Sequence, residues 1–137
     1  MTMQTSGTMS LIMLDLDNFK MVNDIFGHGE GDRVIIALSD VLRQVLHDVD
    51  SAYIGRWGGE EFMVLLQNED INAAVALAEK IRKTFASLSF ETAGHQTVSI
   101  GVTQARAGEN SDMLCSRVDK ALYRAKENGK NQVVRLD

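Results

Sequence analysis

Two pairs of acidic residues stand where carboxylates could do chemistry. Asp15 and Asp17 close a short apolar run, LIMLDLD, at residues 11–17. In an extended strand both point to one face, while Leu14 and Leu16 point to the other. Carboxylates at the end of an apolar strand repel each other and lose hydration, and a hard cation such as Mg²⁺ offsets both effects. The spacing therefore favours a cation site, although a bare D-x-D is also found at ordinary strand ends.

The second pair lies in RWGGEEF, residues 56–62, where Glu60 and Glu61 follow two glycines. Glycine suits a tight turn and lets the backbone approach a ligand closely. Because neighbouring strand residues face opposite ways, we expect only one glutamate to join Asp15. If this hairpin lies beside the first strand, acids from two remote stretches share one metal, as in two-metal phosphoryl-transfer enzymes. The alternative is a solvent-exposed hairpin without a ligand.

The elements that must position these acids follow from hydrophobic periodicity. Strands are predicted at residues 11–17, 52–57, 61–66, 95–105 and 132–136, and helices at residues 33–46, 71–88 and 111–127. Residues 17–32 are predicted to be a turn-rich connection, with Asp32 as the N-cap of the next helix. Ser111 or Asp112 is expected to cap the last helix. The resulting order, β-α-β-β-α-β-α-β, predicts an α+β fold with a mixed five-stranded sheet, related to the ferredoxin-like pattern.

Composition narrows the functional classes. A chain of 137 residues is the size of one domain, and its net charge of −5 disfavours a general nucleic-acid binder. The single cysteine, Cys115, excludes an internal disulfide and fits a reducing compartment. We interpret it as a small core residue, with a reactive thiol as the alternative. No membrane segment or signal peptide is evident, so a cytoplasmic location is expected, and residues 1–9 are expected to be a disordered lead or an expression remnant.

Four stretches together are specific enough to indicate a family. They are DLDNFKMVNDIFGHGEGD at residues 15–32, GGEEF at 58–62, VSIGVT at 98–103 and VDKALYRAKENGKNQV at 118–133. In this order and spacing the chain resembles the GGDEF family of diguanylate cyclases, in the GGEEF spelling. The resemblance spans residues 10–137 as one catalytic domain. It implies that family's fold, a five-stranded mixed sheet related to nucleotidyl cyclases and polymerase palms.

The resemblance implies a metal site and a base. Asp15 and Glu60 would ligate Mg²⁺, with the backbone carbonyl of Leu16 as a third ligand. Two Mg²⁺ ions would be present when substrate is bound, and Mn²⁺ could replace them. Glu60 would also be the candidate base for the attacking hydroxyl.

The other implied positions would bind GTP. They are Asn23 and Asp32 at the guanine edge, and Asn18, Phe19, Lys20, Gly58, Gly59, Lys126 and Lys130 around the phosphates. Lys130 stands where the family commonly has arginine. Lysine keeps the positive charge but lacks the planar guanidinium fork. Simpler interpretations remain open: Asp32 could be only a helix cap, Asn23 only a turn residue, and Lys126 only a favourable charge at a helix C-terminus.

The implied reaction joins two GTP molecules into cyclic di-GMP with release of two pyrophosphates. Because one domain holds one GTP, the resemblance implies an antiparallel homodimer, and a regulatory domain, fused or separate, outside this chain. The alternative is a non-catalytic module of the same fold that binds GTP or cyclic di-GMP. A third possibility is a protein-interaction domain with no ligand.

Two departures from the family pattern stand out. The product-inhibition motif R-x-x-D is not found, because His47 stands where arginine would precede Asp50. The family's opening turn and first helix also have no counterpart before residue 10. The sheet face that this helix covers is therefore expected to be exposed or covered by a partner chain.

Overall fold

The computed structural model describes residues 8–137, which form five strands and four helices. The strands are β1 (Met9–Leu16), β2 (Ala52–Arg56), β3 (Glu61–Gln67), β4 (Val98–Gln104) and β5 (Val133–Leu136), and the helices are α1 (Phe19–Phe26), α2 (His28–Val45), α3 (Ile71–Ala86) and α4 (Ser111–Glu127). The predicted lead falls mostly on residues 1–7, outside the described residues, and β1 begins at Met9.

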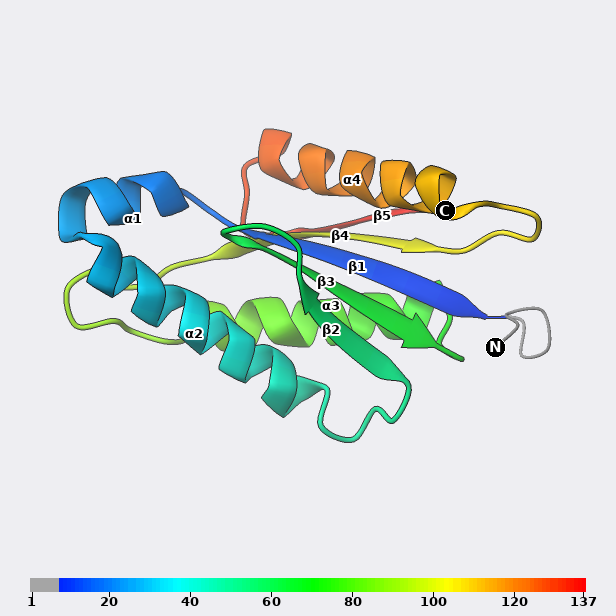
Figure 1. The fold of residues 1–137 in the computed structure, drawn as a ribbon, viewed down its shortest axis with the longest axis horizontal. Coiled ribbons are helices and arrows are strands. Elements are labelled where there is room, and N and C mark those ends of the chain that lie inside the picture. The colour runs from blue at the N-terminus through cyan, green and yellow to red at the C-terminus, as the bar shows by residue number, and fades with distance from the viewer. Residues whose placement is uncertain (1–7) are drawn as a thin grey trace.

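The sheet has the strand order β2-β3-β1-β4-β5, with β1 at its centre (Figure 1). Strand β1 pairs antiparallel with β3 and with β4, β2 pairs antiparallel with β3, and β4 pairs parallel with β5. This mixed five-stranded sheet confirms the predicted fold class. Strand β1 carries apolar residues on both faces because helices cover both of its sides.

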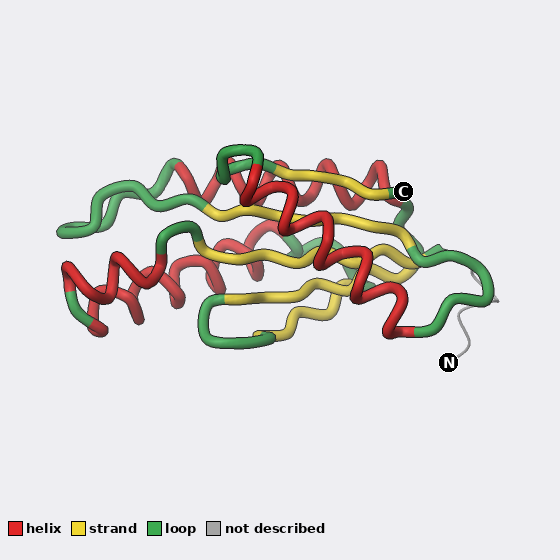
Figure 2. The backbone as a smooth tube through the Cα atoms, turned by 90° about the horizontal axis from the view of Figure 1, so that it is seen from above, coloured by secondary structure: helices red, strands yellow, loops and turns green. Residues whose placement is uncertain are grey.

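Helices α2 and α3 lie on one face of the sheet and α4 lies on the other (Figure 1). Ile12, Leu14 and Leu16 of β1 belong to the larger core beneath α2 and α3. Leu11 and Met13 belong to a smaller core beneath α4. Seen from above, α4 runs across the strands (Figure 2). Alternate side chains of β1 thus pack against the α2 and α3 layer on one face and against α4 on the other.

The face that α4 occupies is only partly covered. Helix α4 packs on β4, β5 and β1, whereas β2 packs mainly against β3. The side chains of Tyr53 and Trp57 are 57% and 64% exposed.

Residues 17–32 differ from the prediction of a turn-rich connection. Two helices occupy this stretch, α1 and the first turns of α2, which begins at His28 rather than near residue 33. Gly27 stands at the N-cap, so Asp32 lies inside α2 and the prediction that it caps the helix is wrong. Position 31 of the helix has no room for a side chain, because a Cβ there would overlap Asn23 Oδ1 and lie 3.3 Å from Phe19 Cζ. Close packing of α1 on α2 therefore outweighs the low helix propensity of glycine.

The remaining elements follow the predictions with shifted ends. Predicted core residues of α4, from Leu114 to Ala125, are buried, but its N-cap is Asn110, whose side chain accepts from the Met113 N–H at 2.8 Å. Strand β4 begins at Val98, so residues 95–97 form a loop. Cys115 packs half-buried against the smaller core, as interpreted. None of the helices within residues 8–137 combines the length and apolarity that a bilayer crossing requires.

Candidate active site

Asp15 lies near the C-terminal end of β1 and has an unusual environment. Its Oδ1 is buried and has no hydrogen-bond partner within the described structure. The pKa of Asp15 is raised to about 7, chiefly by burial and also by the neighbouring Glu60 carboxyl, while the positive charge of Lys126 opposes the rise. A buried carboxyl with one free oxygen is suited to a ligand that brings positive charge.

Both glutamates of the β2–β3 turn act on Asp15. The strand register places Glu61 directly opposite Asp15, and the Leu16 N–H donates to the backbone carbonyl of Glu60 at 3.3 Å. The Glu60 carboxyl raises the pKa of Asp15, and the charge of Glu61 raises it to a smaller extent. Both glutamates thus lie near Asp15, and the expectation that only one of them joins it at a metal stays a prediction. Strict alternation does not apply, because Glu60 lies in the turn before β3 begins.

The turn itself does not use the special freedom of glycine. Neither Gly58 nor Gly59 adopts a positive φ, and a Cβ at Gly59 would meet no atom within 4 Å. The Arg56 guanidinium donates to both glycine carbonyls, at 3.3 Å and 2.6 Å. The glycines thus leave open space over the acids, which agrees with close approach of a ligand.

Asp17, two residues beyond Asp15, is a buried anchor. Its carboxylate accepts hydrogen bonds from four donors: Thr97 Oγ1 at 2.7 Å, Ser99 Oγ at 2.6 Å, Lys126 Nζ at 2.9 Å and the Asn131 N–H at 3.0 Å. Burial alone would raise the pKa of Asp17, but these hydrogen bonds outweigh it and hold the pKa below its ordinary value. With its oxygens engaged in this way, Asp17 ties β1 to β4 and to the α4–β5 loop.

The two predicted phosphate lysines lie at the end of α4: Lys126 is in its last turn and Lys130 is in the loop that follows. The Lys126 ammonium lies 3.2 Å from the Leu16 carbonyl oxygen and 3.7 Å from Asp15 Oδ1. The Lys130 ammonium donates to Asn18 Oδ1 at 2.7 Å. The structure therefore brings Lys126 and Lys130 to the acids and to the start of α1.

The residues expected to bind the nucleotide lie on α1 and α2. Asn23 packs against Gly31, the neighbour of Asp32, and Asp32 is exposed. Phe19 is buried, so only its backbone faces the site, whereas Lys20 is exposed and pairs with Asp24 at 3.0 Å. Asn18 precedes α1 in a left-handed conformation and makes no side-chain capping hydrogen bond. The first N–H groups of α1 thus lack a side-chain cap.

The donor set fits Mg²⁺ held together with phosphates. No group of three or more His, Cys, Asp or Glu side chains within residues 8–137 is arranged to hold a metal by itself. The available oxygens are the Asp15 and Glu60 carboxyls and the Leu16 carbonyl. Magnesium is commonly bound by one or two carboxylates, with waters and substrate phosphates completing its shell. The unpartnered Asp15 oxygen agrees with this arrangement.

No sequence signal pointed to Glu30, which is 2% exposed in the first turn of α2. Its carboxylate accepts from Thr92 Oγ1 at 2.7 Å, the Ala93 N–H at 2.9 Å and Arg33 Nε at 2.8 Å. These bonds lower the pKa of Glu30 to about 2. They hold the loop before β4, which is more than 60 residues away in sequence. Its place on a helix could have been predicted only if the start of α2 had been set at His28 instead of near residue 33.

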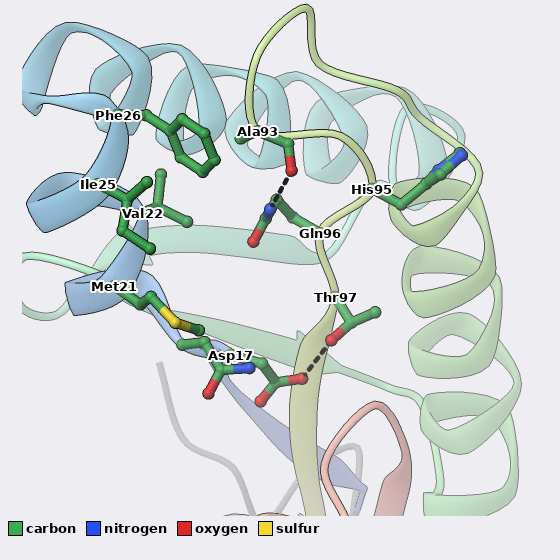
Figure 3. Close-up of a pocket in the computed structure, with 10 residues that line it drawn as sticks. Asp17, Met21, Val22, Ile25, Phe26, Ala93, His95, Gln96 and Thr97 are labelled. Carbon is green, nitrogen blue, oxygen red and sulfur yellow. Dashed lines mark hydrogen bonds between the residues drawn. The ribbon is translucent and has the colours of Figure 1, made fainter.

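That loop and α1 enclose a pocket of about 380 Å³. Figure 3 shows Met21, Val22, Ile25 and Phe26 on one side and the loop residues on the other. The lining residues are Asp17, Asn18, Met21, Val22, Ile25, Phe26, Ala93, His95, Gln96 and Thr97. The pocket contains neither Asp15 nor Glu60, so it lies beside the acid site and is not formed by it.

Comparisons with known proteins agree with this geometry. The profile described as "Diguanylate cyclase, GGDEF domain" matches residues 2–132. The chain is 44% identical over 125 residues to diguanylate cyclase DgcM of Escherichia coli, covering 91% of this chain and 30% of DgcM. It is 40% identical over 126 residues to a diguanylate cyclase of Vibrio cholerae, covering 90% of this chain and 39% of that protein. The chain thus spans only about a third of these relatives.

Solved structures give the same answer. The active GGEEF domain of a Vibrio cholerae diguanylate cyclase matches with a TM-score of 0.89 and 39% identity, over 95% of this chain and 83% of that one. The GGDEF domain of DgcB from Caulobacter crescentus, in complex with c-di-GMP, matches with a TM-score of 0.88 and 33% identity, over 96% and 80%. The chain therefore belongs to the diguanylate cyclase family of GGDEF domains.

Proposed function

We propose that this chain is a catalytically competent, Mg²⁺-dependent diguanylate cyclase domain. The observation that carries the proposal is the meeting of Asp15 and Glu60, which come from remote stretches of sequence. The Glu60 carboxyl is close enough to raise the pKa of Asp15, and one buried Asp15 oxygen has no hydrogen-bond partner, only the Lys126 ammonium 3.7 Å away. Mg²⁺ is usually bound by one or two carboxylates together with substrate phosphates, so two such acids suit a metal-dependent phosphoryl-transfer site.

The acids and one carbonyl would hold the metal. Asp15, Glu60 and the Leu16 carbonyl would bind Mg²⁺, which activates a hydroxyl and neutralises phosphate charge when present. Glu60 would accept the proton from the 3′-hydroxyl of one GTP as that oxygen attacks the α-phosphorus of the other, and the bond from that phosphorus to the bridging oxygen would break to release pyrophosphate. Mn²⁺ would serve the same donor set, because carboxylate and carbonyl oxygens suit both ions.

Lysine side chains and the N-terminus of α1 would hold the triphosphate. The backbone N–H groups at the start of α1 lack a side-chain cap, which supports phosphate binding there. Lys126 and Lys130 lie beside the acids, and Lys20 is exposed on α1. Gly58 and Gly59 would leave room for the phosphates over the turn.

The base would be held between α1 and α2. Asn23 offers an amide and Asp32 a carboxylate, which match the mixed acceptors and donors of the guanine edge. The exposure of Asp32 supports this role. Because Asp32 does not cap α2, its carboxylate is available for the base.

The wider assembly is part of the same proposal. One domain would hold one GTP, so two chains would face each other antiparallel with their GGEEF turns inward. A regulatory domain, fused or separate, would control the encounter. A solved relative, SiaD from Pseudomonas aeruginosa, is described in complex with its activator SiaC. We infer a cytoplasmic setting, in which GTP is available.

The decisive experiment compares cyclic di-GMP formation from GTP and Mg²⁺ by the wild type, Glu60→Gln and Asp15→Asn. Each variant removes a negative charge from the metal site, so a loss of about 100-fold or more is expected. Glu91→Gln, an exposed carboxyl in the loop before β4, is the control and should retain activity. Circular dichroism establishes that each variant is folded.

Three results would contradict the proposal. Full activity in either site variant would remove that residue from the mechanism. Binding of GTP or cyclic di-GMP by the wild type, measured by calorimetry with Mg²⁺ and without any turnover, would establish the non-catalytic module instead. Failure to bind either nucleotide would indicate an interaction domain without a ligand.

A further inference from the structure

The positive charge nearest the acid site comes from the protein itself. The Lys126 ammonium lies 2.9 Å from Asp17 Oδ1, 3.2 Å from the Leu16 carbonyl oxygen and 3.5 Å from the Asp15 carbonyl oxygen. It also forms an ion pair with Asp15 Oδ1 at 3.7 Å. The side chain is 23% exposed and reaches back more than 100 residues in sequence. Lys126 thus occupies the oxygen-rich position at the end of β1.

This position overlaps the proposed metal ligands. Mg²⁺ binds oxygen at about 2 Å, so an ion on the Leu16 carbonyl would lie within about 5 Å of an ammonium that is hydrogen-bonded to the same oxygen. The two cations would repel strongly at that separation in a partly buried site. Consequently the divalent ion and the ammonium are competitors while Lys126 keeps this conformation.

The fold holds the lysine in this place. The Asp17 carboxylate that accepts from Lys126 is itself fixed by Ser99, Thr97 and the Asn131 backbone. Asp17 is 2% exposed, whereas the lysine stem is long and reaches the surface. The lysine can therefore leave while its acceptor stays, and a triphosphate at the start of α1 offers another anionic partner.

We propose that Lys126 is a resident counter-ion that keeps divalent cations out of the nucleotide-free site. Its ammonium neutralises Asp15 and Asp17 until a triphosphate draws it away and the metal enters with the nucleotide. This inference rests on the proposed metal site but concerns the state before substrate binds. It assigns Lys126 a role in the order of binding, in addition to the phosphate contact proposed above.

The test measures Mn²⁺ binding to the whole chain without nucleotide, by the loss of the free-ion electron paramagnetic resonance signal. Lys126→Met removes the competing charge, so it should bind Mn²⁺ about tenfold or more tightly than the wild type. Lys120→Met, an exposed lysine on the same helix, should leave the affinity unchanged. Equal or weaker binding by Lys126→Met would overturn the proposal.

Two further variants keep the result interpretable. Lys126→Gln is also neutral but can still donate a hydrogen bond to Asp17, so it should show the same gain even if Lys126→Met folds poorly. Adding Asp15→Asn to either variant should abolish the gain, because the added affinity must come from this site. A gain that survives Asp15→Asn would contradict the mechanism. This test measures Mn²⁺ affinity and not turnover, so it can fail or succeed independently of the proposed cyclase activity.

Discussion

At the scale of single residues, two aspartates in one motif have opposite electrostatic properties. Asp15 has a buried oxygen without a hydrogen-bond partner, and its pKa is raised to about 7, chiefly by burial. Asp17 accepts four hydrogen bonds, which hold its pKa below the ordinary value despite burial. The difference arises from donors on β4, α4 and the α4–β5 loop. This difference supports the proposed role of Asp15 in metal binding, whereas Asp17 holds the framework together through its four hydrogen bonds.

Replacing Asp17 with alanine is expected to destabilise the fold. The change leaves Lys126, Ser99 and Thr97 without their shared acceptor in a buried place. Loss of one partner from a buried ion pair costs about 3–5 kcal/mol. Urea unfolding followed by circular dichroism measures this loss. Asp24→Ala, at an exposed aspartate on α1, should change stability by no more than about 0.5 kcal/mol. A small effect at Asp17 would contradict its role as an anchor.

Glu30 is expected to make stability depend on pH in the acid range. Its pKa is about 2 in the folded chain and near 4.5 in the unfolded chain. The stabilisation is therefore complete above about pH 4.5 and is lost as the pH falls towards about 2, because the unfolded state takes up the proton first. Glu30→Gln resembles the protonated acid and should lack this contribution at every pH.

Urea unfolding of the wild type and Glu30→Gln at several pH values measures the effect. The wild type should be more stable at neutral pH, and the gap should narrow as the pH falls below about 4.5. The comparison cancels other acids with lowered pKa values, such as Asp17 and Glu109. A gap independent of pH would show that Glu30 does not carry this linkage.

At the scale of elements, the packing of α4 on β4 depends on one glycine. A Cβ at Gly101 would overlap the backbone nitrogen of Leu122 and lie 2.7 Å from the carbonyl oxygen of Val118. Because these are backbone atoms of α4, no side chain can move aside. The helix that carries Lys126 is positioned by this contact, so the packing also sets the geometry of the site.

Gly101→Ala is accordingly expected to destabilise the protein by about 3 kcal/mol or more, beyond the usual cost of overpacking. Gly55→Ala is the matched control, because this glycine also lies in a strand and a Cβ there would meet nothing within 4 Å. It should be neutral or stabilise by about 0.5–1 kcal/mol. Thermal unfolding of both variants measures the contrast. Similar stability of the two would indicate that α4 shifts freely on the sheet.

At the scale of the whole molecule, the proposed reaction needs two chains because each holds one GTP. The rate of cyclic di-GMP formation per chain should therefore rise with protein concentration. Well below the dissociation constant of the dimer, a tenfold dilution should lower this rate by about tenfold, as mass action requires. Activity assays over a dilution series, with analytical ultracentrifugation at the same concentrations, measure it. A constant rate per chain from a monomer would exclude catalysis across a dimer.

Much of the fold and part of the site could be predicted from local sequence. The periodicities of α3, α4 and the β2–β3 hairpin lie within single segments, so they could be read directly. Residues 17–32 could not, because Gly29 and Gly31 suggest turns. Only the packing of Gly31 against Asn23 and Phe19 shows why a helix forms there. The role of Glu30 was hidden for the same reason.

The sequence by itself determined the acids, their order along the chain and the family to which they belong, because those depend on residue types and spacing. The tertiary structure decided which aspartate has a free oxygen, where the Lys126 ammonium lies and that both glutamates act on Asp15. Burial and hydrogen bonding set these properties, and the partners of Asp17 come from 80 to 114 residues away. Such contacts exist only once the sheet and α4 have packed.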